Sequence, residues 1–276
     1  NAGELEREAI EKDTMVRMMV GRDVGQFYRK TDHRPGEPVL EIKSLRTMAY
    51  PHQEVDLCLR SGEILCLAGL VGAGRSELAR AIFGIDEVEG GSIFMEGAEL
   101  SRHTVMDAVA AGICLIPEDR KAEGLFLDFS ITENIAMPSH TVLARKGFVD
   151  HEAETVLADK SREKLRIKAA HLDRAVAELS GGNQQKVVIA KWLAMNPRLI
   201  ILDEPTRGID VGAKAEVYHL MQELAAQGAA ILVISSDMEE VIGVSDRVAV
   251  MCRGRISGIL ERDALSEENI LRLAVE

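Results

Sequence analysis

A glycine-rich segment near residue 70 combines residue types that could bind phosphate. It follows the apolar run 64–67 and precedes apolar residues at helical spacing. Its residues are Gly69, Leu70, Val71, Gly72, Ala73, Gly74, Arg75 and Ser76, with Glu77 next in the chain. Glycines let the backbone curl so that successive N–H groups point at a phosphate, and a helix start adds positive dipole. The Ser76 hydroxyl could then bind Mg²⁺. Arg75 departs from the motif GxxxxGK[ST], which leaves a plain glycine-rich turn as the alternative.

A second segment, 199–204, places two acids directly after a run of aliphatic residues. The run predicts a strand at the centre of a sheet, and Asp203 and Glu204 would emerge at its carboxyl end, beside the glycine-rich loop. Asp203 would then bind the Mg²⁺ that Ser76 also touches. Glu204 would orient and deprotonate a water for attack on a γ-phosphate. The alternative is an acidic cap between a strand and a loop.

A third segment, 179–185, opens a predicted helix with the sequence LSGGNQQ. Ser180, Gly181 and Gly182 offer a hydroxyl and backbone N–H groups at the helix N-terminus, which is an arrangement that binds anions. The alternative is a serine that only caps an ordinary helix.

The elements that must position these segments alternate between strands and helices. We expect strands at 39–45, 54–59, 64–67, 90–97, 113–116, 198–205, 229–235 and 246–252. We expect helices after the glycine-rich loop and at 104–111, 179–195, 213–227, 238–242 and 265–275. Wholly apolar strands that alternate with helices predict a mostly parallel sheet covered on both faces. The charged stretch 119–179 lacks strand signals and is interpreted as a helical insertion.

Bulk composition limits the classes of partner. The chain has 276 residues and a net charge of −12, which argues against direct binding to nucleic acid or to anionic lipid. No apolar stretch reaches the length that spans a membrane. The chain begins Asn-Ala, so we expect a piece of a longer polypeptide. Residues 4–20 are predicted to be helical or irregular and 21–38 to be a linker, with the folded unit beginning near Val39.

The order of the motifs GLVGAGRS, LSGGNQQ, ILDEP and VISSD resembles that of ATP-binding cassette (ABC) ATPases. More narrowly, IPEDRKAEGL and DEPTRGIDVGAK resemble the second, C-terminal cassette of tandem ATPases that energise importers of ribose, galactose, xylose or arabinose. The resemblance implies an α/β P-loop fold with a mostly parallel central sheet, an antiparallel β subdomain and a helical subdomain at about 119–179. It implies that 39–276 is the ATP-binding domain. It also implies that 1–38 holds a tag remnant, the tail of a first cassette (14–23) and a linker.

The resemblance also implies a mechanism, with ATP and Mg²⁺ as cofactors. Two cassettes sandwich two ATP molecules, so the glycine-rich loop would hold one ATP while Ser180–Gly182 reach the ATP held by the partner. Asp210 matches a loop through which the two sites sense each other. The implied partners are the first cassette of the same polypeptide, a transmembrane sugar permease contacted by the helical insertion, and, indirectly, an external sugar-binding protein. The implied location is the cytoplasmic face of the membrane, as a peripheral protein.

Three positions depart from the family pattern. Arg75 replaces a lysine, Glu118 replaces a glutamine with possible roles toward metal or water, and Ser236 replaces a histidine. Tyr50 is the candidate to stack on adenine. The departures lead to the hypothesis that this site binds ATP but hydrolyses it slowly, while its Ser180–Gly182 segment completes the competent site of the first cassette.

Two other functions stay open from the sequence. One is a non-hydrolytic, regulatory ATP-binding cassette, which Arg75 and Ser236 favour and Glu204 opposes. The other is a soluble tandem ABC protein that acts on ribosomes or DNA, which would need a basic surface that a net charge of −12 opposes.

Overall fold

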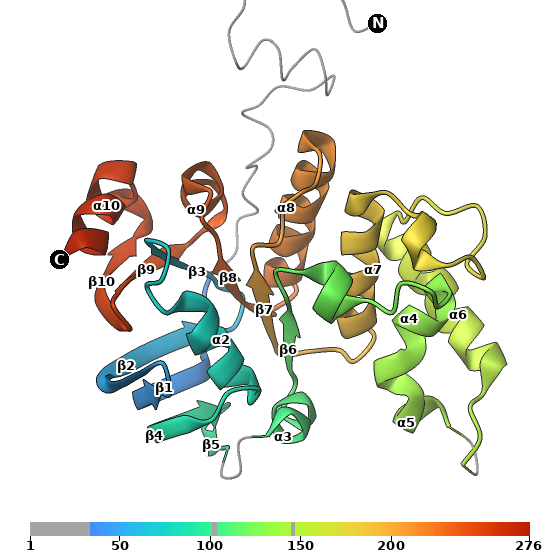
Figure 1. The fold of residues 1–276 in the computed structure, drawn as a ribbon, viewed down its shortest axis with the longest axis horizontal. Helices are drawn as coiled ribbons and strands as arrows, with labels where there is room; N and C mark the ends of the chain where they lie inside the picture. Colours follow the sequence, from blue (N-terminus) through green and yellow to red (C-terminus); the bar gives the residue numbers. More distant parts are fainter. Residues whose placement is uncertain (1–33, 101–103, 145–146) are drawn as a thin grey trace, which may run out of the picture.

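The computed structural model describes residues 34–100, 104–144 and 147–276, which form two sheets covered by helices (Figure 1). The predicted segment 4–20 and most of the predicted linker lie outside the described residues. Within the described residues, the structure holds no helix with both the length and the hydropathy needed to span a bilayer.

The central sheet has six strands in the order β10-β9-β3-β8-β7-β6. Its strands are β3 (Ile64–Gly69), β6 (Ile113–Ile116), β7 (Leu199–Asp203), β8 (Ala230–Ile234), β9 (Arg247–Cys252) and β10 (Arg255–Glu261). All neighbours are parallel except β9 and β10, which form an antiparallel hairpin at one edge. The predicted mostly parallel sheet is therefore confirmed.

The second sheet is antiparallel, with the order β2-β1-β4-β5. Its strands are β1 (Pro38–Thr47), β2 (Tyr50–Arg60), β4 (Val88–Met95) and β5 (Ala98–Glu99). β1 and β2 are longer than the predicted strands 39–45 and 54–59, because they continue into a tight hairpin that ends at the Thr47–Tyr50 pair. Tyr50 therefore lies at the first position of β2 rather than in a free loop.

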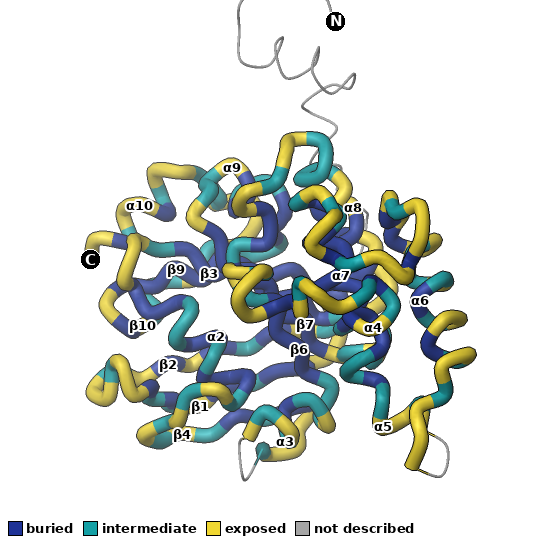
Figure 2. The backbone as a smooth tube through the Cα atoms, turned by 45° about the vertical axis from the view of Figure 1, so that its right-hand side comes forward, coloured by how far each residue is buried: buried dark blue, intermediate teal, exposed yellow. Residues whose placement is uncertain are grey.

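Alternate residues of the central strands enter two hydrophobic cores. In β3, Ile64, Cys66 and Ala68 face one core, and Leu65 and Leu67 face the other, all of them buried. The second core lies between the two sheets and includes α2 (Arg75–Phe83) and α3 (Val105–Ala110). Figure 2 shows the central strands as the buried middle of the molecule. Burial on both faces explains why these strands are apolar at every position.

Helices α7 to α10 cover the first core and the helical insertion adjoins it. These helices are α7 (Gly181–Leu193), α8 (Val211–Ala226), α9 (Met238–Val244) and α10 (Glu267–Val275). The insertion contains η3 (Arg120–Gly124), α4 (Ile131–Ala136), η4 (Met137–Ser139), α5 (His140–Leu143), α6 (His151–Leu165) and η5 (Val176–Glu178). A short 3₁₀ turn, η6 (Arg262–Ala264), precedes α10. Helix α4 starts with a capping box, in which the side chains of Ser130 and Glu133 each bond the other's backbone N–H.

The edge strand β10 was not predicted from the sequence. Its residues are partly exposed and include Gly258, so neither a buried apolar run nor a clear alternation marks it. The turn before it contains Arg253 and Gly254, both with positive φ, which is the geometry of a tight hairpin turn. The signal for β10 therefore lay in the Arg-Gly turn rather than in the strand.

Candidate functional site

The glycine-rich loop runs from the end of β3 to the start of α2, as the sequence predicted. Gly69 has a φ of 152°, and a Cβ there would lie 2.4 Å from the carbonyl oxygen of Met251. Gly72 has a φ of 78°, and a Cβ there would meet nothing within 4 Å. The loop therefore packs tightly on the sheet at Gly69 and opens to free space at Gly72, where a phosphate could approach the backbone N–H groups.

Tyr50 packs on this loop from the antiparallel sheet. Its hydroxyl donates to the carbonyl oxygen of Gly72 at 2.5 Å. Its ring lies against two glycines, since a Cβ on Gly74 would be 2.9 Å from the ring and one on Gly254 only 2.1 Å from it. The structure thus places the predicted adenine-stacking residue at the loop and also shows why residues 74 and 254 are glycines.

Arg75, the first residue of α2, is buried and turned toward the end of β8. Its Nη1 donates to the carbonyl oxygen of Ser235 at 2.8 Å. Guanidinium carries five N–H donors in a fixed plane, so this bond orients the whole group while other donors stay available. Arg75 therefore connects the glycine-rich loop to the loop that follows β8.

Ser76 and Asp203 come together as the predicted metal pair. Asp203 ends β7 and is only 6% exposed. Burial raises the pKa of its carboxyl group, and a hydrogen bond from Ser76 opposes that rise. Its Oδ1 is buried without a hydrogen-bond partner among the described residues. A buried carboxylate with one free oxygen, next to a hydroxyl, fits Mg²⁺, which usually takes one or two protein carboxylates together with phosphate oxygens.

Glu204 contacts Ser236, the residue predicted at the switch position. The Ser236 hydroxyl donates to Oε2 of Glu204 at 3.0 Å. The backbone N–H of Glu204 donates to the carbonyl oxygen of Ile234 at 2.8 Å, and its φ is 46°. This left-handed backbone turns the side chain away from the strand direction. Glu204 and Ser236, two of the three predicted catalytic residues, are therefore in direct contact.

Glu118 lies near the predicted metal ligands Ser76 and Asp203, but its carboxylate is paired with another side chain. It lines a cavity of about 360 Å³ together with Ser76 and Asp203. Its carboxylate forms an ion pair with the side chain of Arg207, on the loop that follows β7. The sequence reasoning missed Arg207, although this arginine lies within the DEPTRG motif. The negative charge that Glu118 brings is therefore balanced by a cation three residues after Glu204.

The Ser180–Gly182 segment lies at the start of α7, beside Asp210. Ser180 is exposed and its hydroxyl accepts from Nδ2 of Asn183 at 3.0 Å. A Cβ on Gly182 would lie 2.6 Å from Cβ of Ala213, so α7 and α8 approach closely here. Asp210 caps α8 by accepting from the N–H of Ala213 at 3.0 Å. The two segments predicted to communicate with a partner cassette are thus packed together.

Arg120 is a further residue at this place that the sequence reasoning did not single out. Its guanidinium donates to the carbonyl oxygens of Arg207 at 2.9 Å and Gly208 at 3.3 Å. A Cβ on Gly181 would lie 2.7 Å from one of its nitrogens. Arg120 therefore links the first turn of the helical insertion to the loop after β7 and to the start of α7.

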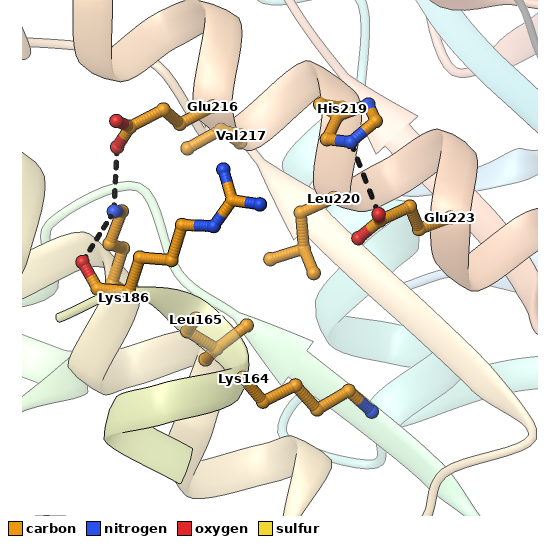
Figure 3. A pocket seen from close by; sticks show the side chains of 9 residues that line it. Lys164, Leu165, Lys186, Glu216, Val217, His219, Leu220 and Glu223 are labelled. Carbon is orange, nitrogen blue, oxygen red and sulfur yellow. Dashed lines mark hydrogen bonds and ion pairs between the residues drawn. The ribbon is translucent and has the colours of Figure 1, made fainter.

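An ion pair between Lys186 and Glu216 holds α7 against α8 (Figure 3). Lys186 of α7 is buried, and its Nζ lies 2.6 Å from Oε2 of Glu216 on α8 and 3.0 Å from the carbonyl oxygen of Arg166, the residue that caps α6. A buried cation satisfied by a carboxylate and a carbonyl restricts the relative position of three helices. This contact helps to keep Ser180–Gly182 and Asp210 in one arrangement.

Taken together, a phosphate-binding loop at a helix start, a buried carboxylate beside its serine and an acid held by a hydroxyl define a P-loop nucleotide-binding site. A family model described as ABC transporter matches residues 52–207. The chain therefore belongs to the ABC transporter family and is an ABC-type ATPase domain.

Relatives with high sequence identity are named for ribose import. The chain is 48% identical over 264 residues to "Ribose import ATP-binding protein RbsA 2" of Streptomyces coelicolor, covering 96% of this chain and 51% of that protein. It is 47% identical over 262 residues to "Ribose import ATP-binding protein RbsA" of Lactococcus lactis subsp. cremoris, covering 95% and 53%. The chain thus spans about half the length of the curated relatives it matches.

Solved structures confirm the fold. The ATP-binding cassette MJ1267 of an ABC transporter matches with a TM-score of 0.72 and 22% identity, covering 87% of this chain and all of that one. CbiO1 of Clostridium perfringens, part of the ABC transporter complex CbiONQ, matches with a TM-score of 0.70 and 22% identity, covering 86% of this chain and 94% of that one. The expected ABC-type P-loop fold is therefore confirmed.

We expect Tyr50→Ala to weaken ATP binding about tenfold, because stacking of a base on an aromatic ring contributes about 1–3 kcal/mol. Tyr50→Phe keeps the ring and loses only the hydrogen bond to Gly72, so its loss should be smaller. The measurement is a titration of the chain with ATP and, in parallel, with tripolyphosphate, which has no base.

Tripolyphosphate is the matched control for the Tyr50 prediction. If Tyr50→Ala weakens both ligands equally, the residue acts by shaping the loop at Gly72 rather than by stacking. If neither ligand is affected, the assignment of Tyr50 to the nucleotide site is wrong.

Proposed function

We propose that this chain is an ATP-binding cassette of an ATPase that energises import of a monosaccharide of the ribose type. The observation that carries the proposal is the 48% identity, across 96% of the chain, to a protein named for ribose import. The same region contains the P-loop, the acids at the end of β7 and the Ser180–Gly182 segment. The partners that follow are a transmembrane permease and an external sugar-binding protein. The location that follows is the cytoplasmic face of the membrane.

In the proposed reaction, the loop 69–76 holds the phosphates of ATP, and Ser76 with Asp203 holds Mg²⁺. Mg²⁺ held by these two residues would neutralise charge on the transferred phosphoryl group. Glu204 orients a water and takes its proton, while the Ser236 hydroxyl fixes the Glu204 carboxylate. Free space at Gly72 and the free Oδ1 of Asp203 support these assignments.

We further propose that the site works as half of a pair. The exposed Ser180 and the adjacent Asp210 would face the ATP of a second cassette, and the chain's coverage of about half of its relatives leaves room for that cassette in the same polypeptide. In this tandem arrangement the chain would be the C-terminal cassette, and its domain would extend over 39–276.

Three contacts support slow hydrolysis at this chain's own site. Arg75 is engaged by the Ser235 carbonyl, Glu118 is engaged by Arg207, and Ser236 offers Glu204 a neutral donor. Ser236 is the one of these three residues that bonds to Glu204, and its hydroxyl cannot carry a positive charge, as a histidine at the switch position could. We therefore propose that this site is specialised for holding ATP.

A stacked aromatic pair on the helical insertion supports contact with a permease. Phe126 and Phe129 are 48% and 45% exposed, and their ring centroids lie 5.4 Å apart. Nζ of Lys191 lies 5.4 Å from the centroid of the Phe126 ring and donates to the carbonyl oxygen of Gly124 at 3.1 Å. Lys191 also lines the cavity that contains Ser76 and Asp203. A partner seated on these rings would thus contact a wall of the metal site.

Replacing both Phe126 and Phe129 by alanine should reduce co-purification with the permease about tenfold or more, because buried aromatic anchors dominate interface energies. ATP binding by the isolated chain should stay unchanged. The matched control is Met106→Ala, which removes a side chain that is 75% exposed on α3, away from the insertion. Equal losses for the control and the double variant would refute this docking surface.

The solute is tested by reconstitution of the full-length protein with its permease and binding protein in vesicles that contain MgATP. The expected result is ribose uptake that requires Glu204 or its counterpart in the other cassette. Uptake of a different monosaccharide would correct the solute and keep the importer assignment. Stimulation of ATPase activity by ribosomes or DNA, with no sugar uptake, would refute the proposal.

A further inference from the structure

The loop Ser235–Asp237, between β8 and α9, contacts two parts of the nucleotide site. The carbonyl oxygen of Ser235 accepts from Arg75 at 2.8 Å, and the hydroxyl of Ser236 donates to Glu204 at 3.0 Å. Movement of this loop would therefore displace a residue of the phosphate-binding loop and the catalytic acid together.

A buried acid of α9 also holds this loop. Glu240, in the first turn of α9, is 1% exposed, and its Oε2 accepts from the Ser235 hydroxyl at 2.5 Å. The same hydroxyl accepts from the N–H of Asp237 at 3.0 Å. In a common capping box the third residue of the helix bonds the N-cap N–H directly. Here the Ser235 hydroxyl bridges Glu240 and the N–H of the N-cap residue Asp237. Glu240 therefore holds in place the residue whose carbonyl contacts Arg75.

Charged and polar groups from neighbouring elements surround Glu240. Asp237 caps α9 and is paired with Lys214 of α8, whose Nζ lies 3.0 Å away. Burial raises the pKa of Glu240 to about 7, and Asp237 raises it as well, whereas the Ser235 hydrogen bond, Lys214 and Thr206 lower it. Its Oε1 is buried and has no hydrogen bond to another described residue.

We propose that Glu240 is a positioning residue of the nucleotide site, which fixes Ser235 and thereby holds Arg75 and Ser236 in place for MgATP. The ionised carboxylate makes a stronger hydrogen bond to the Ser235 hydroxyl than the neutral acid does. Proton uptake by Glu240 therefore loosens the loop and weakens ATP binding. This inference concerns the ATP site and does not depend on which solute is transported.

Stability and ATP binding should respond to pH in opposite directions. Because burial raises the pKa of Glu240 above its ordinary 4.5, the folded protein binds this proton more tightly than the unfolded chain does. The stabilisation of the folded state by the proton on Glu240 is fully present below pH 4.5 and is lost as the pH rises through about 7. ATP affinity, in contrast, should increase over the same interval as the carboxylate forms. If Glu240 had a purely structural role, stability would fall with pH and ATP affinity would not rise.

The experiment compares MgATP affinity of the full chain and its Glu240→Gln variant at about pH 6 and about pH 8, on either side of this transition. Glutamine keeps the shape of Glu240 and resembles the neutral acid. At the higher pH we expect Glu240→Gln to bind about fivefold more weakly than the wild type, with the two nearly equal at the lower pH. Comparison at each pH cancels the titration of ATP itself.

The matched control is Glu239→Gln, the same substitution at an exposed neighbour, which should follow the wild type at both pH values. A second variant, Ser235→Ala, should also bind weakly and without the pH-dependent difference. The inference is overturned if Glu240→Gln binds like the wild type at both pH values or is equally weakened at both. It is also overturned if Ser235→Ala keeps the wild-type pH profile.

Discussion

Replacing Ser180 by arginine is expected to lower ATP hydrolysis by the proposed full-length tandem protein by a factor of about 10²–10³, the usual cost of losing a donor to the reacting phosphate. Ser180 is exposed at the start of α7, so an arginine there adds bulk and charge at the surface that would face the partner's ATP. The fold should tolerate it for the same reason. The measurement is steady-state ATPase activity, with thermal unfolding to verify folding.

Glu204→Gln in the same tandem protein should leave most of the turnover intact. The substitution keeps the size of the side chain and an oxygen that can accept from Ser236. It removes the base from a site that we propose to hold ATP rather than to split it. The contrast between the two variants thus separates the role of the segment Ser180–Gly182 from that of this chain's own acid.

Ala177→Arg is the matched control for Ser180→Arg. Ala177 is exposed three positions earlier in the chain, and an arginine there adds the same charge outside the helix start. Its turnover should equal that of the wild type. If Glu204→Gln abolishes turnover while Ser180→Arg leaves it unchanged, the division of labour between the cassettes is wrong and this site is the hydrolytic one.

Asp203→Asn should remove the dependence of ATP binding on Mg²⁺ and at the same time stabilise the nucleotide-free chain. Asp203 is 6% exposed, and its Oδ1 has no hydrogen bond among the described residues. Without a bound cation, its buried negative charge therefore lowers the stability of the folded chain. Removing that charge should raise the unfolding free energy by about 1 kcal/mol, or the melting temperature by about 3 °C. The amide remains able to bond to Ser76.

The Asp203 prediction is measured by ATP titration with MgCl₂ and with EDTA, and by thermal unfolding without nucleotide. The wild type should bind ATP more tightly with Mg²⁺, and the variant should bind it equally in both conditions. Asp263→Asn, at an exposed position in η6, controls for removal of a surface charge. A variant that is less stable than the wild type and still responds to Mg²⁺ would contradict the assignment of Asp203 as a metal ligand.

The sequence by itself determined the parallel strands of the central sheet and the local chemistry of each motif. A strand buried on both faces must be apolar at every position, which marks β7 and β8 without reference to other elements. The glycine-rich loop is likewise a local property, because positive φ at Gly72 and Gly74 requires glycine wherever the loop lies. The pair Ser76 and Asp203 followed from the rule that the carboxyl ends of parallel strands meet at one edge.

The tertiary structure decided how the charges of the site are balanced. Glu118 is paired with Arg207, and Arg75 is bonded to the Ser235 carbonyl, although the partners in each pair lie far apart in the sequence. Sequence spacing carries no information about which side chains meet across a loop, because that depends on how the insertion and the loop after β7 pack. For the same reason the contact of Tyr50 with Gly72 appears only in the folded chain.

Glu240 shows the distinction most clearly. In the sequence it is one acid of a Glu-Glu pair in a short helix, with nothing that separates it from Glu239. In the structure Glu239 is exposed, whereas Glu240 is buried and bonded to the hydroxyl of Ser235. Helix periodicity predicts that neighbours face different directions, but only the packing of α9 against β3 and against the loop after β8 decides which of the two is desolvated and what it bonds to.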